Sequence, residues 1–266
     1  MYEQFRETAM AAARLAGREA LQRWRAPHTT RSKGPRDIVT EADIAAEHVA
    51  VELILSNYPN HAILAEEGGE SAGGSHVSEF QWIIDPIDGT TNYARGLPIF
   101  TVSVAVAENG RPVAGVLYDP LQDQMYHAIR GGGAFCDDQK LACSTRGALP
   151  GFLIAVDWPR DEAVRSRMFE AALTHSAQIG GWRTLGSAAL GIAMVGAGIV
   201  DAYMHPSLHT WDMAAAGLIV EEAGGKVTGL SGSPNWWEGA SCLASNGHAH
   251  DALLDLFQSI PESTNS

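Results

Sequence analysis

Two aspartates followed directly by a Gly-Thr-Thr run are the residues of this chain best placed, by type and spacing, to do chemistry. Residues 82–92 read W-I-I-D-P-I-D-G-T-T-N, an apolar strand-like run that ends at Asp85 and Asp88. Pro86 has no N–H donor, so the strand ladder is interrupted and the turn can aim both carboxylates outward. Hard divalent cations bind such oxygen ligands, and the Gly-Thr-Thr run supplies N–H groups and hydroxyls for a phosphate at a helix N-terminus. The stretch therefore predicts a metal-assisted phosphatase.

Each acid also has a purely structural explanation. Asp is common in turns and at helix starts, but two acids as close as Asp85 and Asp88 repel unless a cation lies between them. Asp212 lies at the start of a predicted helix, and its only role could be a favourable interaction with the helix dipole. Glu66 lies at the end of a strand and is the first residue of a Glu-Glu pair. There it could share a metal with Asp85 and polarise a water, or be a solvated loop acid. Metal binding is favoured only when these acids are considered together.

Length, charge and cysteine usage bound the class of protein. The 266 residues allow one compact unit or two tightly packed halves. Lys and Arg total 18 against 31 Asp and Glu, a net charge of −13, which disfavours nucleic-acid and anionic-membrane partners. Three cysteines without a C-x-x-C pair, and no signal-peptide pattern, predict a reduced, cytoplasmic setting. The longest apolar run, 188–200, is too short to span a bilayer.

The first half, residues 1–150, reads as helices packed on an antiparallel sheet. Apolar residues at helical spacing predict a helix over Glu3–Arg25, and residues 28–35 read as a polar, basic loop. Thr40 is a predicted N-cap with Asp43 in the capping-box position of a second helix. Strands are expected at 62–65, 81–84, 100–107, 112–118 and 124–129, with Asn-Gly at 109–110 as a hairpin turn.

The second half, residues 151–266, alternates strands and helices, which favours an α/β arrangement with helices covering a sheet. Strands are expected at 152–156, 202–204, 226–228 and 242–245, and helices at 161–176, 187–198, 211–223 and 248–259.

Four blocks together resemble the inositol monophosphatase family, within the superfamily of lithium-sensitive, magnesium-dependent phosphomonoesterases. The blocks are D-I-V-T-E-A-D (37–43), E-E-G-G (66–69), the run at 82–92, and W-D-M-A-A-A-G-L-I-V-E-E-A-G-G (211–225). The likeness extends from about residue 5 to 255. It implies a mixed α/β fold, the layered α/β/α/β/α sandwich, and a homodimer acting on a small phosphorylated substrate.

The resemblance also implies metal and water roles. Glu66, Asp85 and the Ile87 carbonyl would bind a first Mg²⁺, and Asp85, Asp88 and Asp212 a second. Glu66 would help to hold a weaker third ion. Asp43 and Thr90 would help to activate the attacking water, and no covalent enzyme intermediate is needed.

On the substrate side, the N–H groups of Gly89 and Thr90 would clamp the phosphate. The resemblance places further substrate contacts at Asp88, Gly186, Ser187, Ala188, His205 and Asp212. Lys33 would lie near the site on a basic loop, although a solvated loop lysine is equally compatible with the sequence. Glu67 is a further possible site residue.

The chain departs from the inositol-specific pattern at His205. Inositol-specific relatives have a glutamate there, which accepts hydrogen bonds from ring hydroxyls. A histidine changes charge and reach, so the reaction class is better defined than the substrate. His209 and Arg183 are further candidates for binding a second anionic or polar group, although an isolated histidine is more often a satisfied structural residue.

Several functions remain open at this stage. The expected substrate is inositol-1-phosphate or a related sugar or polyol phosphate; histidinol phosphate, fructose-1,6-bisphosphate and adenosine 3',5'-bisphosphate are the alternatives within the superfamily. Aspartyl-phosphate phosphatases have a superficially similar D-x-D-G-T motif, but with one intervening residue and near the N-terminus. A non-enzymatic alternative is a metal-stabilised phosphate sensor.

Overall fold

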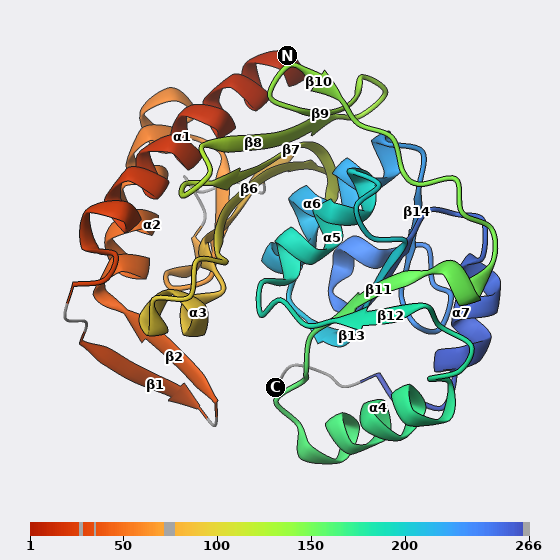
Figure 1. Ribbon diagram of the computed structural model, residues 1–266. Helices are drawn as coiled ribbons and strands as arrows, with labels where there is room; N and C mark the ends of the chain where they lie inside the picture. Colours follow the sequence, from red (N-terminus) through yellow and green to blue (C-terminus); the bar gives the residue numbers. More distant parts are fainter. Residues whose placement is uncertain (27–28, 35, 72–77, 263–266) are drawn as a thin grey trace.

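The computed structural model describes residues 1–26, 29–34, 36–71 and 78–262. Within these ranges the strands form an eight-stranded sheet, a five-stranded sheet and a two-stranded hairpin (Figure 1). The helices are α1 (Tyr2–Arg23), α2 (Glu41–Asn57), α3 (Thr90–Arg95), α4 (Glu162–Thr174), α5 (Ala188–Gly196), α6 (Thr210–Glu222) and α7 (His250–Phe257). The hairpin consists of β1 (Thr30–Gly34) and β2 (Asp37–Thr40).

The first sheet has the strand order β10-β9-β8-β7-β6-β5-β3-β4. Its strands are β3 (Ala62–Ala65), β4 (Gly69–Ser71), β5 (Phe80–Asp88), β6 (Thr101–Glu108), β7 (Arg111–Asp119), β8 (Gln124–Ile129), β9 (Gly133–Cys136) and β10 (Gln139–Lys140). All its pairings are antiparallel except that of β3 with β5, which is parallel. The predicted antiparallel sheet of the first half is thus confirmed with one exception.

The second sheet has the order β12-β11-β13-β15-β14. Its strands are β11 (Leu153–Val156), β12 (Gly181–Arg183), β13 (Ala202–Leu208), β14 (Lys226–Thr228) and β15 (Ala240–Ser245). Strand β11 is parallel to both neighbours, whereas β15 runs antiparallel to β13 and β14.

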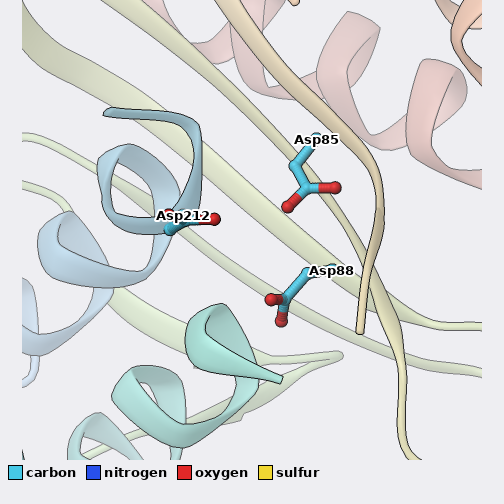
Figure 2. Close-up of side chains that lie close together, drawn as sticks. All are labelled: Asp85, Asp88 and Asp212. Atoms are coloured by element: carbon cyan, nitrogen blue, oxygen red, sulfur yellow. The ribbon is translucent and has the colours of Figure 1, made fainter. Parts of the chain in front are cut away.

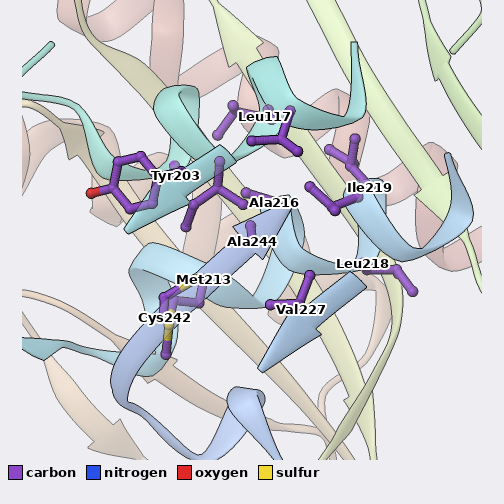
Figure 3. Packing of buried hydrophobic residues seen from close by; sticks show 14 of the residues in the cluster. Leu117, Tyr203, Met213, Ala216, Leu218, Ile219, Val227, Cys242 and Ala244 are labelled. Carbon is purple, nitrogen blue, oxygen red and sulfur yellow. The ribbon is translucent and has the colours of Figure 1, made fainter. Parts of the chain in front are cut away.

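The layers follow the predicted α/β/α/β/α order. Helices α1 and α2 cover one face of the first sheet, and α5 and α6 lie between the two sheets (Figure 1). Figure 3 shows the apolar core of that middle layer, where Leu117 of β7 and Tyr203 of β13 contribute to one cluster with residues of α6. The outer face of the second sheet packs against α4 and α7. Both sheets are covered on two sides, which explains why β6 and β7 are apolar along their length rather than alternating.

Close packing of α6 on the first sheet depends on small residues. A Cβ atom at Gly115 of β7 would lie 2.8 Å from the Cα of Ala215. Ala214 and Ala215 are fully buried against Ala105 and Ala107 of β6. The second-half helix α6 is therefore fixed directly on the first-half sheet.

The hairpin corrects one expectation. Residues 28–35 were expected to form a loop, but residues 30–34 form β1, which pairs antiparallel with β2; positions 28 and 35 lie outside the described residues. The short strands β4, β9, β10 and β12 were also not anticipated, because two to four residues give too little periodicity. None of the described helices combines the length and apolar character needed to cross a bilayer.

Candidate active site

Three carboxylates meet where β5 ends and α6 begins. Asp85, Asp88 and Asp212 each offer an oxygen atom, and these atoms lie within 4.8 Å of one another (Figure 2). Asp85 and Asp88 are buried, and Asp212 is partly exposed. Between Asp85 and Asp88 the pairing register of β5 with β6 shifts by one residue, so β5 carries a bulge there. The bulge turns both Asp85 and Asp88 to the same side, whereas residues three apart in an unbroken strand point to opposite faces.

The cluster is electrostatically unfavourable without a counter-charge. Burial is the main cause that raises the pKa of Asp85 well above its ordinary value, and the charges of Glu66, Asp88 and Asp212 raise it further. The pKa of Asp212 is raised for the same reasons, burial first and then the charges of Asp88 and Glu66. Oxygen-only donors at this spacing suit a hard divalent cation such as Mg²⁺. The residues present therefore fit the metal that the resemblance implies.

Asp88 also joins the two halves of the chain. Its Oδ1 accepts from the Ala188 N–H at 2.9 Å, and its Oδ2 accepts from the Ala189 N–H at 3.0 Å and from the Ser187 hydroxyl. Burial raises the pKa of Asp88, while these hydrogen bonds counteract the rise. A first-half carboxylate thus occupies the N-terminus of α5, where anions are stabilised. The donors of Ser187 and Ala188, expected to face substrate, are directed to Asp88 in this structure.

The segment before α5 is held from both sides. The Asp157 carboxylate accepts from the N–H groups of Gly186 at 2.6 Å and Leu185 at 3.1 Å. Asn92 donates its side-chain amide to the carbonyl oxygens of Leu185 at 2.8 Å and Gly186 at 3.2 Å. Asn92 closes the 82–92 motif, whereas no signal in the sequence pointed to Asp157.

Thr90 and Asp43 form the pair that the resemblance implied, although 47 residues separate them. The Thr90 hydroxyl lies 3.0 Å from Asp43 Oδ1 and 3.1 Å from the carbonyl oxygen of Ile87. Asp43 also completes the predicted capping box of α2, because its Oδ2 accepts from the Thr40 N–H at 2.8 Å. Desolvation is the largest influence on Asp43 and raises its pKa.

Gly89 is required between the acids and α3. Its φ is +104°, and a Cβ there would lie 3.0 Å from the carbonyl oxygen of Ile99 and 3.1 Å from that of Gly186. An L-residue would be both strained and crowded. Glycine therefore lets the chain turn sharply from the carboxylates to the first N–H groups of α3, which have no acceptor within the helix.

Glu66 and Glu67 are bridged by Lys33 of the hairpin. Lys33 Nζ lies 2.9 Å from Glu66 Oε1 and 2.8 Å from Glu67 Oε1. Desolvation raises the pKa of Glu67 to about 7. Glu47 of α2, which the sequence analysis did not identify, accepts from the Glu67 N–H at 2.8 Å and so fixes this turn. Lys33 thus lies at the acidic site rather than in a solvated loop.

Three of the second-half candidates are His205 of β13 and His209 and Asp212 at the start of α6. Asp212 accepts from the His209 N–H at 2.7 Å, so it supports the start of α6 as well as facing the other acids. His209 stacks on Trp211 with ring centroids 4.4 Å apart. His205 is buried in β13, its Nδ1 accepts from the Ser207 N–H at 3.1 Å, and desolvation lowers its pKa to about 3. His205 is therefore a neutral imidazole at physiological pH.

Arg160, which the sequence analysis did not identify, lies between β11 and α4, whereas the candidate Arg183 lies on β12. Arg183 is exposed, and its Nη1 donates to the carbonyl oxygen of its neighbour Trp182 at 2.8 Å. Burial lowers the pKa of His205 and His209, and the charge of Arg160 adds to this effect; at Asp212 the charge of Arg160 opposes the rise in pKa that burial causes. Arg160 Nη2 lies 2.7 Å from Asp37 Oδ1 of the hairpin.

A hollow of about 470 Å³, lined by Arg6, Arg14, His127 and Phe135 among others, lies between α1 and the β8–β9 hairpin. It is on the α1 face of the first sheet, whereas Asp212 is on α6 at the opposite face. We assign the chemistry to the carboxylate cluster, because that is where buried acids, the Thr90–Asp43 pair and the α3 N-terminus converge.

Known proteins are similar to this chain over most of its length. Residues 1–262 match the model of the inositol monophosphatase family. The chain is 37% identical over 253 residues to the Nus factor SuhB of Pasteurella multocida (94% of each chain), and 38% identical over 229 residues to the inositol-1-monophosphatase of Rhizobium meliloti (85% of each). The crystal structure of the extragenic suppressor protein SuhB from Bartonella henselae is similar with a TM-score of 0.90 and 34% identity, covering 95% of this chain and 97% of that one.

Proposed function

Because this chain belongs to the inositol monophosphatase family, we propose that it is a magnesium-dependent phosphatase that hydrolyses a small phosphate monoester. The observation that carries the proposal is the convergence of Asp85, Asp88 and Asp212 beside the Thr90–Asp43 pair. A relative of comparable length is named an inositol-1-monophosphatase, which supports inositol-1-phosphate or a related sugar or polyol phosphate as substrate.

We propose the metal ligands that the resemblance implies, of which Asp85, Asp88 and Asp212 are the acids grouped within 4.8 Å. Asp85, Asp88 and Asp212 would hold one Mg²⁺, and Glu66, Asp85 and the Ile87 carbonyl another, with Glu66 contributing to a weaker third. When bound, the ions supply Lewis-acid stabilisation of the phosphate and lower the pKa of water.

The protein's own part is to place the water and hold the phosphate. Asp43 accepts the hydrogen of the Thr90 hydroxyl, so the oxygen lone pairs of Thr90 are turned to accept a proton from the attacking water. Asp43 is fixed by Thr40, which limits the freedom of the pair. The N–H groups of Gly89 and Thr90, at the start of α3, would bind the non-bridging phosphate oxygens.

The test is a panel of phosphate monoesters assayed with and without Mg²⁺, for the wild-type protein and for Thr90→Val. Valine keeps the shape of threonine but lacks the hydroxyl, and we expect kcat to fall about 10²-fold. Thr91→Val, at the exposed neighbouring position, is the matched control and should stay within about twofold. Hydrolysis that needs no divalent cation, or full activity of Thr90→Val, would contradict the mechanism.

The name Nus factor SuhB, borne by a relative that matches 94% of this chain, favours a second candidate function. A Nus-factor role would not need the carboxylate chemistry. Complementation of a strain lacking its SuhB by wild type and by Asp85→Asn separates the two: equal rescue indicates the second role, and rescue by wild type alone indicates that the acidic site is required.

The remaining features are proposed with the activity. We propose a homodimer, inhibition by lithium and a reduced, cytoplasmic setting, the last supported by the free thiols of Cys136, Cys143 and Cys242. The excess of acidic residues still argues against extended contact of this chain with a nucleic-acid backbone.

A further inference from the structure

We propose that Arg160 binds a second anionic group on the leaving-group side of the substrate, so that phosphate esters carrying a further phosphate or carboxylate are the preferred substrate class. This inference rests on the proposed phosphatase function and concerns the same site. It assigns a specificity role to a residue on the segment between β11 and α4.

The position of Arg160 follows from the second sheet. Strands β11 and β13 are parallel, and Val156 is paired with Met204. Strand β11 ends at Val156, whereas β13 continues through His205, which pairs with Cys242, as far as Leu208. Asp157 therefore follows β11 at its carboxyl end, the end at which α/β sheets bind ligands. Arg160 lies three residues beyond Asp157 on this edge.

A second set of contacts places Arg160 against the hairpin. Its guanidinium pairs with Asp37 of β2, and its carbonyl oxygen accepts from Arg36 Nη1 at 3.1 Å. The same hairpin carries Lys33, which reaches Glu66 and Glu67. Arg160 thus follows a strand of the second sheet and also contacts the hairpin, which borders the metal-ligand acids.

The charge available there suits an anion. The pair with Asp37 engages one nitrogen of a guanidinium that has five N–H donors, and the Arg160 side chain remains 54% exposed. Asp157, the acid at this edge, already accepts from two backbone N–H groups and the Tyr203 hydroxyl. A planar cation that is held at one nitrogen by Asp37 and keeps further N–H donors is suited to bidentate recognition of phosphate or carboxylate.

The experiment compares matched ester pairs that differ in the second group. Sorbitol 6-phosphate against 6-phosphogluconate tests a carboxylate, and fructose 6-phosphate against fructose 1,6-bisphosphate tests a phosphate. For wild type in Mg²⁺ we expect the doubly anionic member of at least one pair to have a kcat/KM at least tenfold higher. Arg160→Gln should reduce that ratio about tenfold, mainly through KM, and Arg160→Lys should retain part of it.

Two controls separate recognition from structure. Arg167→Gln removes an exposed arginine of α4 that pairs with Glu170 and should leave the ratio unchanged. Asp37→Asn breaks the hairpin pair but keeps the cation, so the ratio should be kept or increased; a fall equal to that of Arg160→Gln would show that Arg160 only anchors the hairpin, and would overturn the proposal.

The outcomes also distinguish this inference from the proposed function. Equal loss on both members of each pair, or a wild-type preference for the singly anionic esters, overturns the role of Arg160 while leaving the phosphatase intact. If no ester is hydrolysed, the phosphatase proposal fails, and equilibrium binding of the same pairs by calorimetry decides the anion site: tighter binding of the doubly anionic ester that Arg160→Gln abolishes supports it, and equal binding refutes it.

Discussion

Replacing Asp85 by asparagine should stabilise the metal-free protein while removing its response to Mg²⁺. The three carboxylate oxygens lie within 4.8 Å, where two full charges repel by about 3.5 kcal/mol at an effective dielectric constant of 20. Proton uptake relieves part of this, because the pKa of Asp85 is raised by burial and by its acidic neighbours. Asparagine keeps the acceptor for the Ile87 N–H at 3.0 Å. We expect a net gain of about 1–3 kcal/mol.

The assay is thermal unfolding of both proteins in a chelator and in Mg²⁺. A gain of this size raises Tm by about 2–5 °C for a chain of this length. Mg²⁺ at a hundred times its Kd should stabilise wild type by about 2.7 kcal/mol, whereas Asp85→Asn should gain much less. The order of stability of the two proteins should therefore reverse between the two conditions.

Asp119→Asn is the matched control. Asp119 is also buried, and also accepts backbone N–H groups in a turn, from Leu121 and Gln122. It is not among the clustered acids, so its replacement should bring no gain in a chelator and should leave the Mg²⁺ response intact. A less stable Asp85→Asn protein in a chelator, or an equal Mg²⁺ response in the two proteins, would refute the reasoning.

Three further outcomes are expected. Gly89→Ala should lower the free energy of unfolding by about 1–3 kcal/mol, as measured by denaturant titration. The loss should exceed that of Gly110→Ala, because φ is also positive at Gly110 but a Cβ there would meet nothing within 4 Å. Equal losses would argue against crowding at Gly89. Lys33→Ala should tighten apparent Mg²⁺ affinity up to about fivefold, because an exposed ion pair of about 0.2–1 kcal/mol no longer competes for Glu66; weaker affinity in a Mg²⁺ titration would contradict this. Desolvation raises the pKa of Asp157 to about 6, above the unfolded value of about 4, so the folded state binds the proton more tightly and the contribution of this group to stability is lost as pH rises from about 4 to about 6. Unfolding of wild type and Asp157→Asn in a chelator at both ends of that range should show it, and a pH-independent difference would not fit.

Local chemistry made part of this protein predictable from its sequence. The Thr40–Asp43 capping box is confirmed because its partners are three residues apart and follow a helix-start rule. The Asn109-Gly110 turn joins β6 and β7 as expected, with positive φ at both residues. At the end of β5, the interruption expected at Pro86 is present as a bulge, although the strand resumes as far as Asp88.

Contacts between segments far apart in the chain could not be predicted from local sequence patterns. The N-terminus of α5 is capped by Asp88, about a hundred residues earlier, so Ser187 and Ala188 have a partner that no spacing reveals. Arg160 and Arg183 are alike as residue types, and no local pattern reveals that Arg160 is the one that pairs with Asp37 of the hairpin. The metal and substrate roles of all these residues stay predictions for the assays above.

The seating of α6 on the first sheet bears on whether the chain can be divided. Residues 1–150 contain all eight strands of that sheet, but α6, from the later part of the chain, covers one face of β6 and β7. A fragment ending at residue 150 would expose this apolar face and be prone to aggregate. The remaining fragment would contain α6 without the sheet on which this helix packs. Separately produced fragments should therefore gain native order only on mixing, and the intact chain should unfold in a single cooperative step.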